Sequence, residues 1–266
     1  MQTRRSILMA LASGGLAPSL GHSQVEGIAS LPLPNPQAFQ SGDLIWPKKP
    51  GAFVPYRSGT APQLDTEQLQ WQKERQDFLQ REAKRSASER LSNAQLDFFR
   101  TLDFREFHAR YAGDQRPGVP GAYSTGGGIY VGHVGLIEIE ADGSPWVIEA
   151  IWGKGVIRHS YADWLRGRPG EVVWHGRLRE LSPEARGSIS KEARRHVGTK
   201  YDFWNFDLLD EGGFYCSKLV WLAIMKTQGF AVDGNTEAKR GFWLSPKQLL
   251  YSKPVARLHD PGPYAN

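Results

Sequence analysis

An apolar helix that begins with the only cysteine of the chain is the feature that most constrains this sequence. The segment FYCSKLVWLAIMK, residues 214–226, follows two glycines and has almost no polar face, so we expect a buried helix that ends at Gly229. Cys216 lies in its first turn, where the unpaired backbone N–H groups and the positive end of the helix dipole point. That environment makes a thiol nucleophilic. Free cysteines are also common in protein cores, so both interpretations are open at this point.

The first 23 residues have the features of a targeting segment. Arg4 and Arg5 precede a short apolar stretch, Ile7 to Leu16, which resembles a twin-arginine signal and is too short to span a bilayer. We therefore predict a signal peptide over 1–23 and a periplasmic or secreted protein, with no transmembrane segment in the mature chain. Exported proteins usually carry cysteines as disulfide pairs, so a single unpaired cysteine favours a reactive thiol.

The charge balance excludes one class of partner. The formal net charge is +5, and two of the basic residues lie in the predicted signal. Such a weak excess is not typical of a nucleic-acid-binding protein, although it favours weak attraction to an anionic cell-envelope surface. The sequence contains no HExxH motif and no paired CxxC motifs. It therefore predicts no metal site and no cofactor.

The order of the remaining segments predicts an α+β fold. Residues 24–40 are rich in proline and predict an extended linker, followed by a hydrolase domain over 41–266. Within it, the charge-dense stretch 65–111 predicts a helical insertion with two helices, about 65–85 and 88–111. We expect it to pack on the core, with a lid or a docking arm as the alternative. Elsewhere the sequence predicts strands at 41–47, 129–140, 146–152, 155–160 and 171–178, and helices at 161–167, 183–197, 215–228 and 245–251.

A thiol nucleophile needs a base, and one histidine has a distinctive setting. His133 lies in an apolar strand pattern after a glycine-rich loop, so it is either a core histidine or the partner of Cys216. His159 and His175 lie on strands beside charged residues, where a solvent-facing position is the simpler expectation. The other histidines lie in the signal or in polar contexts that predict exposure, namely His22, His108, His196 and His259.

Glu149 is the only carboxylate in the apolar strand WVIEAIW, and a buried carboxylate requires a partner. In a hairpin centred near residue 141, Glu149 and His133 face each other on one side of the sheet. A strict two-residue turn at 142–143 would instead place Glu149 on the other face. The pairing therefore requires a longer or bulged turn.

Several short motifs, taken in their order, resemble a known family. An early GD pair is followed by GHVGLI, WVIEA, ADWL, KYDF and YCSKLVW. This order resembles the YiiX/YebB-like branch of the NlpC-type cysteine hydrolases, which are circularly permuted papain-like proteins in which the histidine precedes the cysteine. The resemblance covers roughly 41–47 and 130–252, and it implies a mostly antiparallel sheet packed against helices. Lys218 departs from the pattern, because the family commonly has an acid there.

The resemblance also implies roles for the candidate residues. Cys216 would be the nucleophile, His133 the base and Glu149 the group that orients the imidazole. The backbone N–H of Cys216, with Tyr215 or a loop amide, would bind the oxyanion. The candidate cleft aromatics are Tyr130, Trp46, Trp152, Tyr201 and Tyr215.

The function that we expect is an exported cysteine hydrolase that cleaves an amide bond, with peptidoglycan stem peptides at the cell envelope as the candidate substrate. Two alternatives stay open. The first is a lipid acyl hydrolase, acyltransferase or thioesterase, because the fold is similar to that of lecithin:retinol acyltransferase-like enzymes. The second is a non-catalytic binding module. A polar cleft would favour a peptide substrate, and a long apolar groove would favour an acyl substrate.

Overall fold

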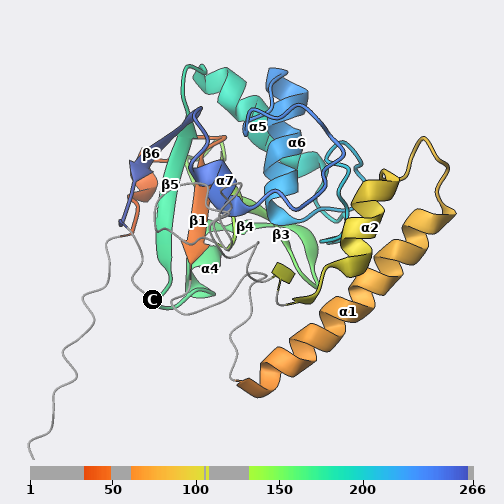
Figure 1. Ribbon diagram of the computed structural model, residues 1–266. Coiled ribbons are helices and arrows are strands. Elements are labelled where there is room, and N and C mark those ends of the chain that lie inside the picture. The colour runs from red at the N-terminus through yellow and green to blue at the C-terminus, as the bar shows by residue number, and fades with distance from the viewer. Residues whose placement is uncertain (1–32, 49–60, 105, 108–131, 263–266) are drawn as a thin grey trace, which may run out of the picture. The chain divides into compact units, whose positions relative to one another are not determined.

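The computed structural model describes residues 33–48, 61–104, 106–107 and 132–262, with side chains in the first helix described from residue 68 (Figure 1). The predicted signal peptide, most of the predicted linker, His108 and Tyr130 lie outside the described residues. In the part of the chain that is described, no helix is both long and apolar enough to cross a membrane.

Six strands form one antiparallel sheet in the order β4-β3-β2-β1-β5-β6. Five of them lie close to their predicted positions, which confirms the expected α+β architecture. The first part of the predicted strand 129–140 is not regular strand, because β2 begins only at Gly135. The sixth strand was not predicted. The bounds are β1 Leu44–Lys48, β2 Gly135–Ile139, β3 Pro145–Ile151, β4 Gly155–Ser160, β5 Val172–Leu178 and β6 Val255–His259.

The helices begin in two different ways. A serine hydroxyl accepts a backbone N–H at the start of α2, α4, α5 and α7. Helix α6 instead begins after Tyr215 with no side-chain cap, and it ends at Gly229, whose φ of 73° suits glycine. The bounds are α1 Ala61–Lys84, α2 Asn93–Thr101, α4 Tyr161–Arg166, α5 Pro183–Arg195, α6 Cys216–Gln228 and α7 Pro246–Leu250, with a 3-10 turn η1 over Pro36–Ala38.

The sheet buries a different apolar cluster on each face. Side chains alternate along a strand, so neighbouring residues such as Ile148 and Val147 enter different clusters. The larger cluster includes α6, which packs with α5 against β2 and β3. The smaller cluster includes Tyr161 and Trp164 of α4, which packs against β3 and β4. Figure 1 shows α5 and α6 together and α4 apart from them.

The inserted helices pack on the core through aromatic side chains. Trp71 and Phe78 of α1 and Phe99 of α2 are buried. Their rings contact Trp204 and other aromatic residues of the 203–206 loop. This agrees with the expectation of a helical pair on the core. The two helices differ from their predicted bounds, because α1 already begins at Ala61 and the break between them extends from residue 85 to 92.

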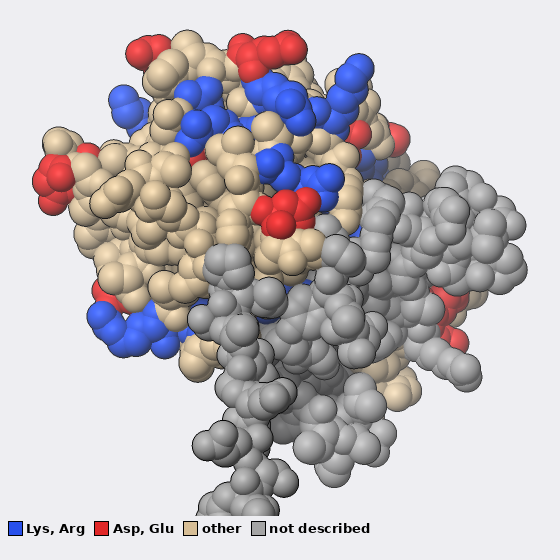
Figure 2. Space-filling model, turned by 90° about the vertical axis from the view of Figure 1, so that its left-hand side faces the viewer, with Lys and Arg blue, Asp and Glu red and all other residues tan. Residues whose placement is uncertain are grey.

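The described part of the predicted linker is packed rather than extended away from the domain. Phe39 is buried in the smaller cluster, and its ring lies 5.0 Å from that of Tyr161. Arg177 of β5 donates a hydrogen bond to the Ala38 carbonyl. The folded unit therefore begins before residue 41. On the face shown in Figure 2, basic side chains gather along the upper part and acidic ones form smaller groups.

Candidate active site

Cys216 and His133 lie next to each other, at the beginning of α6 and just before the beginning of β2. Cys216 is the first residue of α6 and is 5% exposed. His133 lies two residues before β2, and its side chain is 12% exposed. The imidazole contacts the Cys216 thiol, an interaction that raises the pKa of His133. The predicted nucleophile and base are therefore brought together in the structure.

Glu149 is fully buried and accepts hydrogen bonds from four side chains. Its carboxylate oxygens lie 2.7 Å from His133 Nε2, 2.8 Å from His159 Nε2 and 2.9 Å from Trp164 Nε1. Arg168 adds contacts of 3.0 and 3.2 Å. A carboxylate is costly to bury unless its lone pairs are satisfied, and here they are. The expectation that His159 faces solvent is wrong, because its side chain is only 25% exposed and bonds to Glu149.

The turn between β2 and β3 sets this pairing. Ile139 pairs with Pro145, and the turn between them is closed by hydrogen bonds between Glu140 and Ser144 and between Gly143 and Glu140. It is longer than a two-residue turn, as the pairing of His133 with Glu149 requires. The hairpin is centred on residue 142, whereas the sequence predicted a centre near residue 141. Even with this shift, Glu149 stays on the face of the sheet from which it bonds to His133.

The charges in this cluster shift two pKa values in opposite directions. Burial alone would lower the pKa of His133, but the Glu149 carboxylate and the Cys216 thiol outweigh it and raise the pKa to about 9. Burial would raise the pKa of Glu149, yet His133, His159 and Arg168 hold it well below its usual range. Because an ionised carboxylate only accepts hydrogen bonds, His133 Nε2 donates to it. The other ring nitrogen, Nδ1, is then the one left for the thiol.

The first turn of α6 leaves backbone donors beside the thiol. Within the described residues, no side chain caps this turn. The Tyr215 hydroxyl accepts a hydrogen bond from Leu244 N at 3.3 Å and is buried, and burial raises its pKa. The Tyr215 side chain is therefore a core group rather than a cleft aromatic or an oxyanion donor. The backbone N–H groups at the start of α6 remain the nearest candidates for binding an oxyanion.

Residues 124–248 match the model of a family described as permuted papain-like amidase enzyme, YaeF/YiiX, C92 family. The matched segment contains Cys216, His133 and Glu149. This segment belongs to the permuted papain-like amidase family. The expected family is thereby confirmed, and it supports a cysteine hydrolase.

A crystal structure described as metalloprotein yiiX from Escherichia coli O157:H7 is similar to this chain, with 16% sequence identity and a TM-score of 0.46. The likeness covers 84% of this chain and 98% of that one. A comparison with curated proteins found no match. Among the residues that the structure describes, no group of three or more His, Cys, Asp or Glu side chains is arranged to hold a metal ion.

The aromatic residues predicted to line a cleft divide into two groups. Trp46 is fully buried and donates from Nε1 to the Pro246 carbonyl at 3.0 Å, so it is a core residue rather than a cleft residue. Trp152 is 54% exposed, and Tyr201 is half-buried beside Phe214, close to the nucleophile. Burial raises the pKa of Tyr201 well above its usual value, and the nearby Cys216 makes the next largest contribution. Trp152 and Tyr201 lie in the same pocket.

That pocket, which we call the Glu74 pocket, has a volume of about 400 Å³. It lies between the inserted helix α1, the turn after β3 and the loop that follows residue 199. Sequence reasoning missed the contribution of α1, because nothing local in 65–111 indicates what it packs against. Its described lining residues are Glu74, Asp77, Arg81, Trp152, Gly153, Lys200, Tyr201, Asp202, Phe203 and Trp204.

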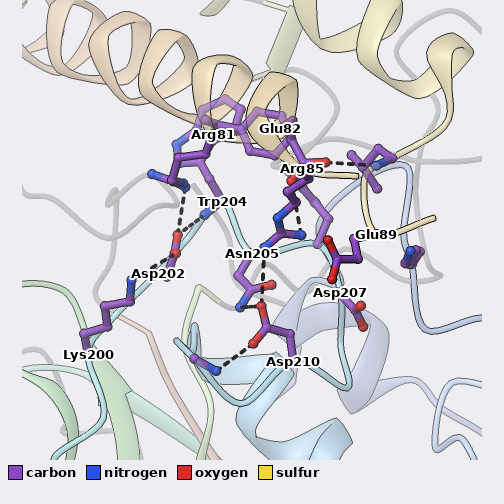
Figure 3. Close-up of a pocket in the computed structure, with 15 residues that line it drawn as sticks. Arg81, Glu82, Arg85, Glu89, Lys200, Asp202, Trp204, Asn205, Asp207 and Asp210 are labelled. Carbon is purple, nitrogen blue, oxygen red and sulfur yellow. Dashed lines mark hydrogen bonds and ion pairs between the residues drawn. The ribbon is translucent and has the colours of Figure 1, made fainter. Parts of the chain in front are cut away.

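A smaller pocket of about 150 Å³ lies farther along α1 (Figure 3). Its charged side chains pair across the pocket. Arg81 lies 3.5 Å from Asp202, and Arg85 lies 3.6 Å from Asp210. These ion pairs join the inserted helix to the 200–213 loop, which also carries Tyr201.

Two other histidines differ from their predicted positions. His175 is buried, not solvent-facing, and its Nε2 lies 2.8 Å from Asp43. Arg177 also bonds to Asp43, which makes this cluster a buried link between β1 and β5. His196 is buried against Glu192 and Phe214 rather than exposed. In each case the burial comes from a partner distant in sequence or from helix packing that the local pattern does not indicate.

Lys218 is the residue at which the sequence departs from the expected motif. It is fully buried, and within the described residues its Nζ has no hydrogen-bond partner. The ammonium lies 5.4 Å from the centre of the Phe214 ring. Burial lowers the pKa of Lys218 to about 8, and the aspartates of the 202–210 segment oppose that shift.

Proposed function

We propose that the chain is an exported hydrolase that cleaves an amide bond through Cys216, His133 and Glu149. The observation that carries this proposal is the chain of contacts from the thiol to His133 and from His133 to the buried Glu149. A nucleophile, a base and a group that orients the base form the minimum set for acyl transfer. Glu149 keeps the imidazole positively charged and directs Nδ1 at the sulfur.

The reaction begins with attack of the Cys216 thiolate on the amide carbonyl carbon. A C–S bond forms, and the carbonyl oxygen becomes an oxyanion beside the N–H groups at the start of α6. When the C–N bond breaks, His133 gives its proton to the leaving nitrogen. An acyl-thioester and a free amine result.

Water then completes the cycle. His133, now neutral, takes a proton from the water as the oxygen attacks the thioester carbonyl. The C–S bond breaks, and the carboxylic acid product leaves with the thiolate and the imidazolium restored. Glu149 stays ionised throughout and stabilises the charged imidazole in each half of the cycle.

The properties of the Glu74 pocket favour a peptide over a lipid acyl chain. Its rim carries acidic and basic side chains, including Asp77, Arg81 and Lys200. A long acyl chain would require an apolar groove instead, because burying its methylene groups supplies the binding energy. We therefore keep peptidoglycan stem peptides at the cell envelope as the candidate substrate, with export supported by the Arg4–Arg5 segment.

Hydrolysis of a soluble peptidoglycan fragment by the purified mature chain tests the proposal. We expect release of a new amine, and loss of that activity in Cys216→Ala. A labelled alkylating agent should react with Cys216 near neutral pH in the same preparation. A Cys216 that resists alkylation would contradict any hydrolase role, whereas a reactive Cys216 without fragment cleavage would contradict only the substrate.

A further inference from the structure

The Glu74 pocket depends on the insertion and includes Tyr201, which forms a β-bridge with Phe214, two residues before the proposed nucleophile. Tyr201 lines the pocket, and both Cys216 and Glu74 contribute to its raised pKa, after burial. Tyr201 therefore lies within electrostatic reach of both the thiol and the carboxylate. Glu74 comes from α1, so the inserted helix brings a carboxylate to the side of the proposed reaction centre.

Most charges in the pocket are neutralised by neighbours. Arg81 and Lys200 both lie beside Asp202, at 3.5 and 3.9 Å. Asp77 pairs with Lys73 at 2.9 Å, one helical turn earlier on α1. Two cations share the single Asp202 carboxylate, so one positive charge remains there, and the Lys200 side chain is 70% exposed, where solvent screens its charge.

Glu74 differs from the other charged residues of the pocket. It accepts hydrogen bonds from Gln70 Nε2 at 2.9 Å and from Trp204 Nε1 at 3.2 Å. Both donors are neutral, and within the described residues no Lys, Arg or His side chain forms an ion pair with Glu74. The neutral donors hold the carboxylate in place, and in the described part of the chain it has no direct ion-pair partner.

The same pocket is rich in aromatic side chains. Trp152, Tyr201, Phe203 and Trp204 line it together with Glu74. The faces of aromatic rings attract cations, and a carboxylate adds a charge-assisted hydrogen bond to an ammonium group. A partly buried carboxylate next to several aromatic rings is suited to binding an organic cation rather than an anion.

We propose that the Glu74 pocket binds a primary ammonium group of the substrate, close to the amide bond that Cys216 attacks. This inference rests on the proposed function, because it assigns part of the same substrate. The ammonium is either the free amino terminus of a peptide or an amine on a side chain. Glu74 is thus a specificity residue supplied by the insertion.

Charged thiol reagents test the pocket without a known substrate. Aminoethyl, hydroxyethyl and sulfonatoethyl methanethiosulfonate carry the same reactive group with a positive, neutral and negative tail. The Cys216 sulfur attacks the outer sulfur of the reagent, a disulfide forms and methanesulfinate leaves. We expect the cationic reagent to modify Cys216 roughly fivefold faster, relative to the neutral one, than it modifies a free thiol in solution.

Two variants isolate the role of Glu74. Glu74→Gln should lower the ratio of the cationic to the neutral reagent rate to the ratio found for a free thiol. Glu89→Gln removes the same charge from an exposed position outside this pocket and should keep the preference. An equal preference in wild type and Glu74→Gln would overturn the inference. If Glu74→Gln misfolds, the wild-type preference must still fall as salt is added, and a preference insensitive to salt counts against the proposal.

Matched peptide amides then separate the two sources of the ammonium. One peptide carries a free α-amino group, one is acetylated, and one is acetylated but has a lysine next to the scissile bond. Faster hydrolysis of the first assigns a peptide amino terminus, and faster hydrolysis of the third assigns a side-chain amine. Equal rates for all three would overturn the inference, while a total lack of reactivity of Cys216 would instead defeat the proposed function.

Discussion

His133 Nε2 lies 2.7 Å from Glu149 Oε2, and the same imidazole also contacts the Cys216 thiol. Glu149 shares its face with Val147, in the cluster that includes Trp164 of α4, and it bonds to Trp164. Cys216 belongs to the cluster on the α6 side. Because His133 precedes the regular part of β2, its imidazole reaches both.

Removing the charge of Glu149 tests this relationship. Glu149→Gln keeps the shape of the side chain but removes the carboxylate charge that raises the pKa of His133, so this pKa should fall below its wild-type value of about 9. We expect hydrolysis to drop by about 10²–10⁴-fold. Titration of His133 by NMR and kcat/KM measurements would show both effects. Glu138→Gln is the matched control, because Glu138 pairs with Arg158 and Arg194 instead, and comparable losses in both variants would refute the assignment.

The raised pKa of His133 also predicts how activity depends on pH. The leaving nitrogen needs the His133 proton, so kcat/KM should decline above about pH 9. In Glu149→Gln, the residual activity should decline at a lower pH. A pH profile of both proteins on one substrate makes this comparison, and an unchanged alkaline limb in the variant would argue against the role of the carboxylate.

The same group contributes to stability over a defined pH range. The folded pKa of about 9 exceeds the unfolded value of 6.5, so the folded state binds the proton more tightly. The resulting stabilisation is fully present below about pH 6.5 and is lost as the pH rises through about 9. Chemical denaturation of wild type and His133→Gln should show a stability difference that shrinks across this range. A difference that grows with pH would contradict the sign.

A close backbone approach at Gly155 predicts a sharp contrast between two glycines. Gly155 has a φ of 78°, and a Cβ atom there would lie 2.3 Å from the Thr199 carbonyl oxygen. Gly153 has a similar φ of 76°, with nothing within 4 Å of such a Cβ. We expect Gly153→Ala to cost about 1 kcal/mol and Gly155→Ala more than about 2 kcal/mol. If both variants lose the same free energy of unfolding in urea, the positive φ alone determines the cost and the contact with Thr199 adds nothing.

Lys218 predicts a gain of stability from a loss of charge. Its pKa of about 8 lies below the unfolded value of 10.5, so the protonated side chain opposes folding. The contribution of Lys218 to wild-type stability should therefore rise with pH between about 8 and 10.5. Lys218→Met should be about 1–3 kcal/mol more stable at pH 7 and lack this rise. Lys200→Met is the exposed control and should change little, and a destabilised Lys218→Met would show that the nearby aspartates outweigh burial.

Much of the site could be predicted because its elements have strong local patterns. The α6 segment is apolar, begins at Cys216 and ends at Gly229, and these features predicted its bounds closely. Glu149 was identified because a lone carboxylate in an apolar strand needs partners. The number of those partners could not be predicted, because His159, Trp164 and Arg168 reach it only after β4 and α4 fold back on β3.

The rest of the fold depended on pairing between distant segments. β6, Val255–His259, is short and contains Arg257, so its alternation is weak, and only its pairing with β5 makes it a strand. His175 is buried with Asp43, the residue immediately before the neighbouring strand β1, which accepts its hydrogen bond. Similarly, α1 carries charges that suggest a solvated helix, while Trp71 and Phe78 attach it to aromatic residues near Trp204.

The uncapped start of α6 has a consequence for how the protein responds to ligands. In the serine-capped helices, the serine hydroxyl accepts a hydrogen bond from a backbone N–H of the first turn. In α6, within the described residues, no side chain accepts a hydrogen bond from the first backbone N–H groups. A peptide aldehyde that adds to Cys216 would place an oxygen where those amides point. It would act as the missing cap and would bind the folded chain alone, so the melting temperature should rise with its concentration. The substrate oxygen would thus cap the same helix that carries the nucleophile.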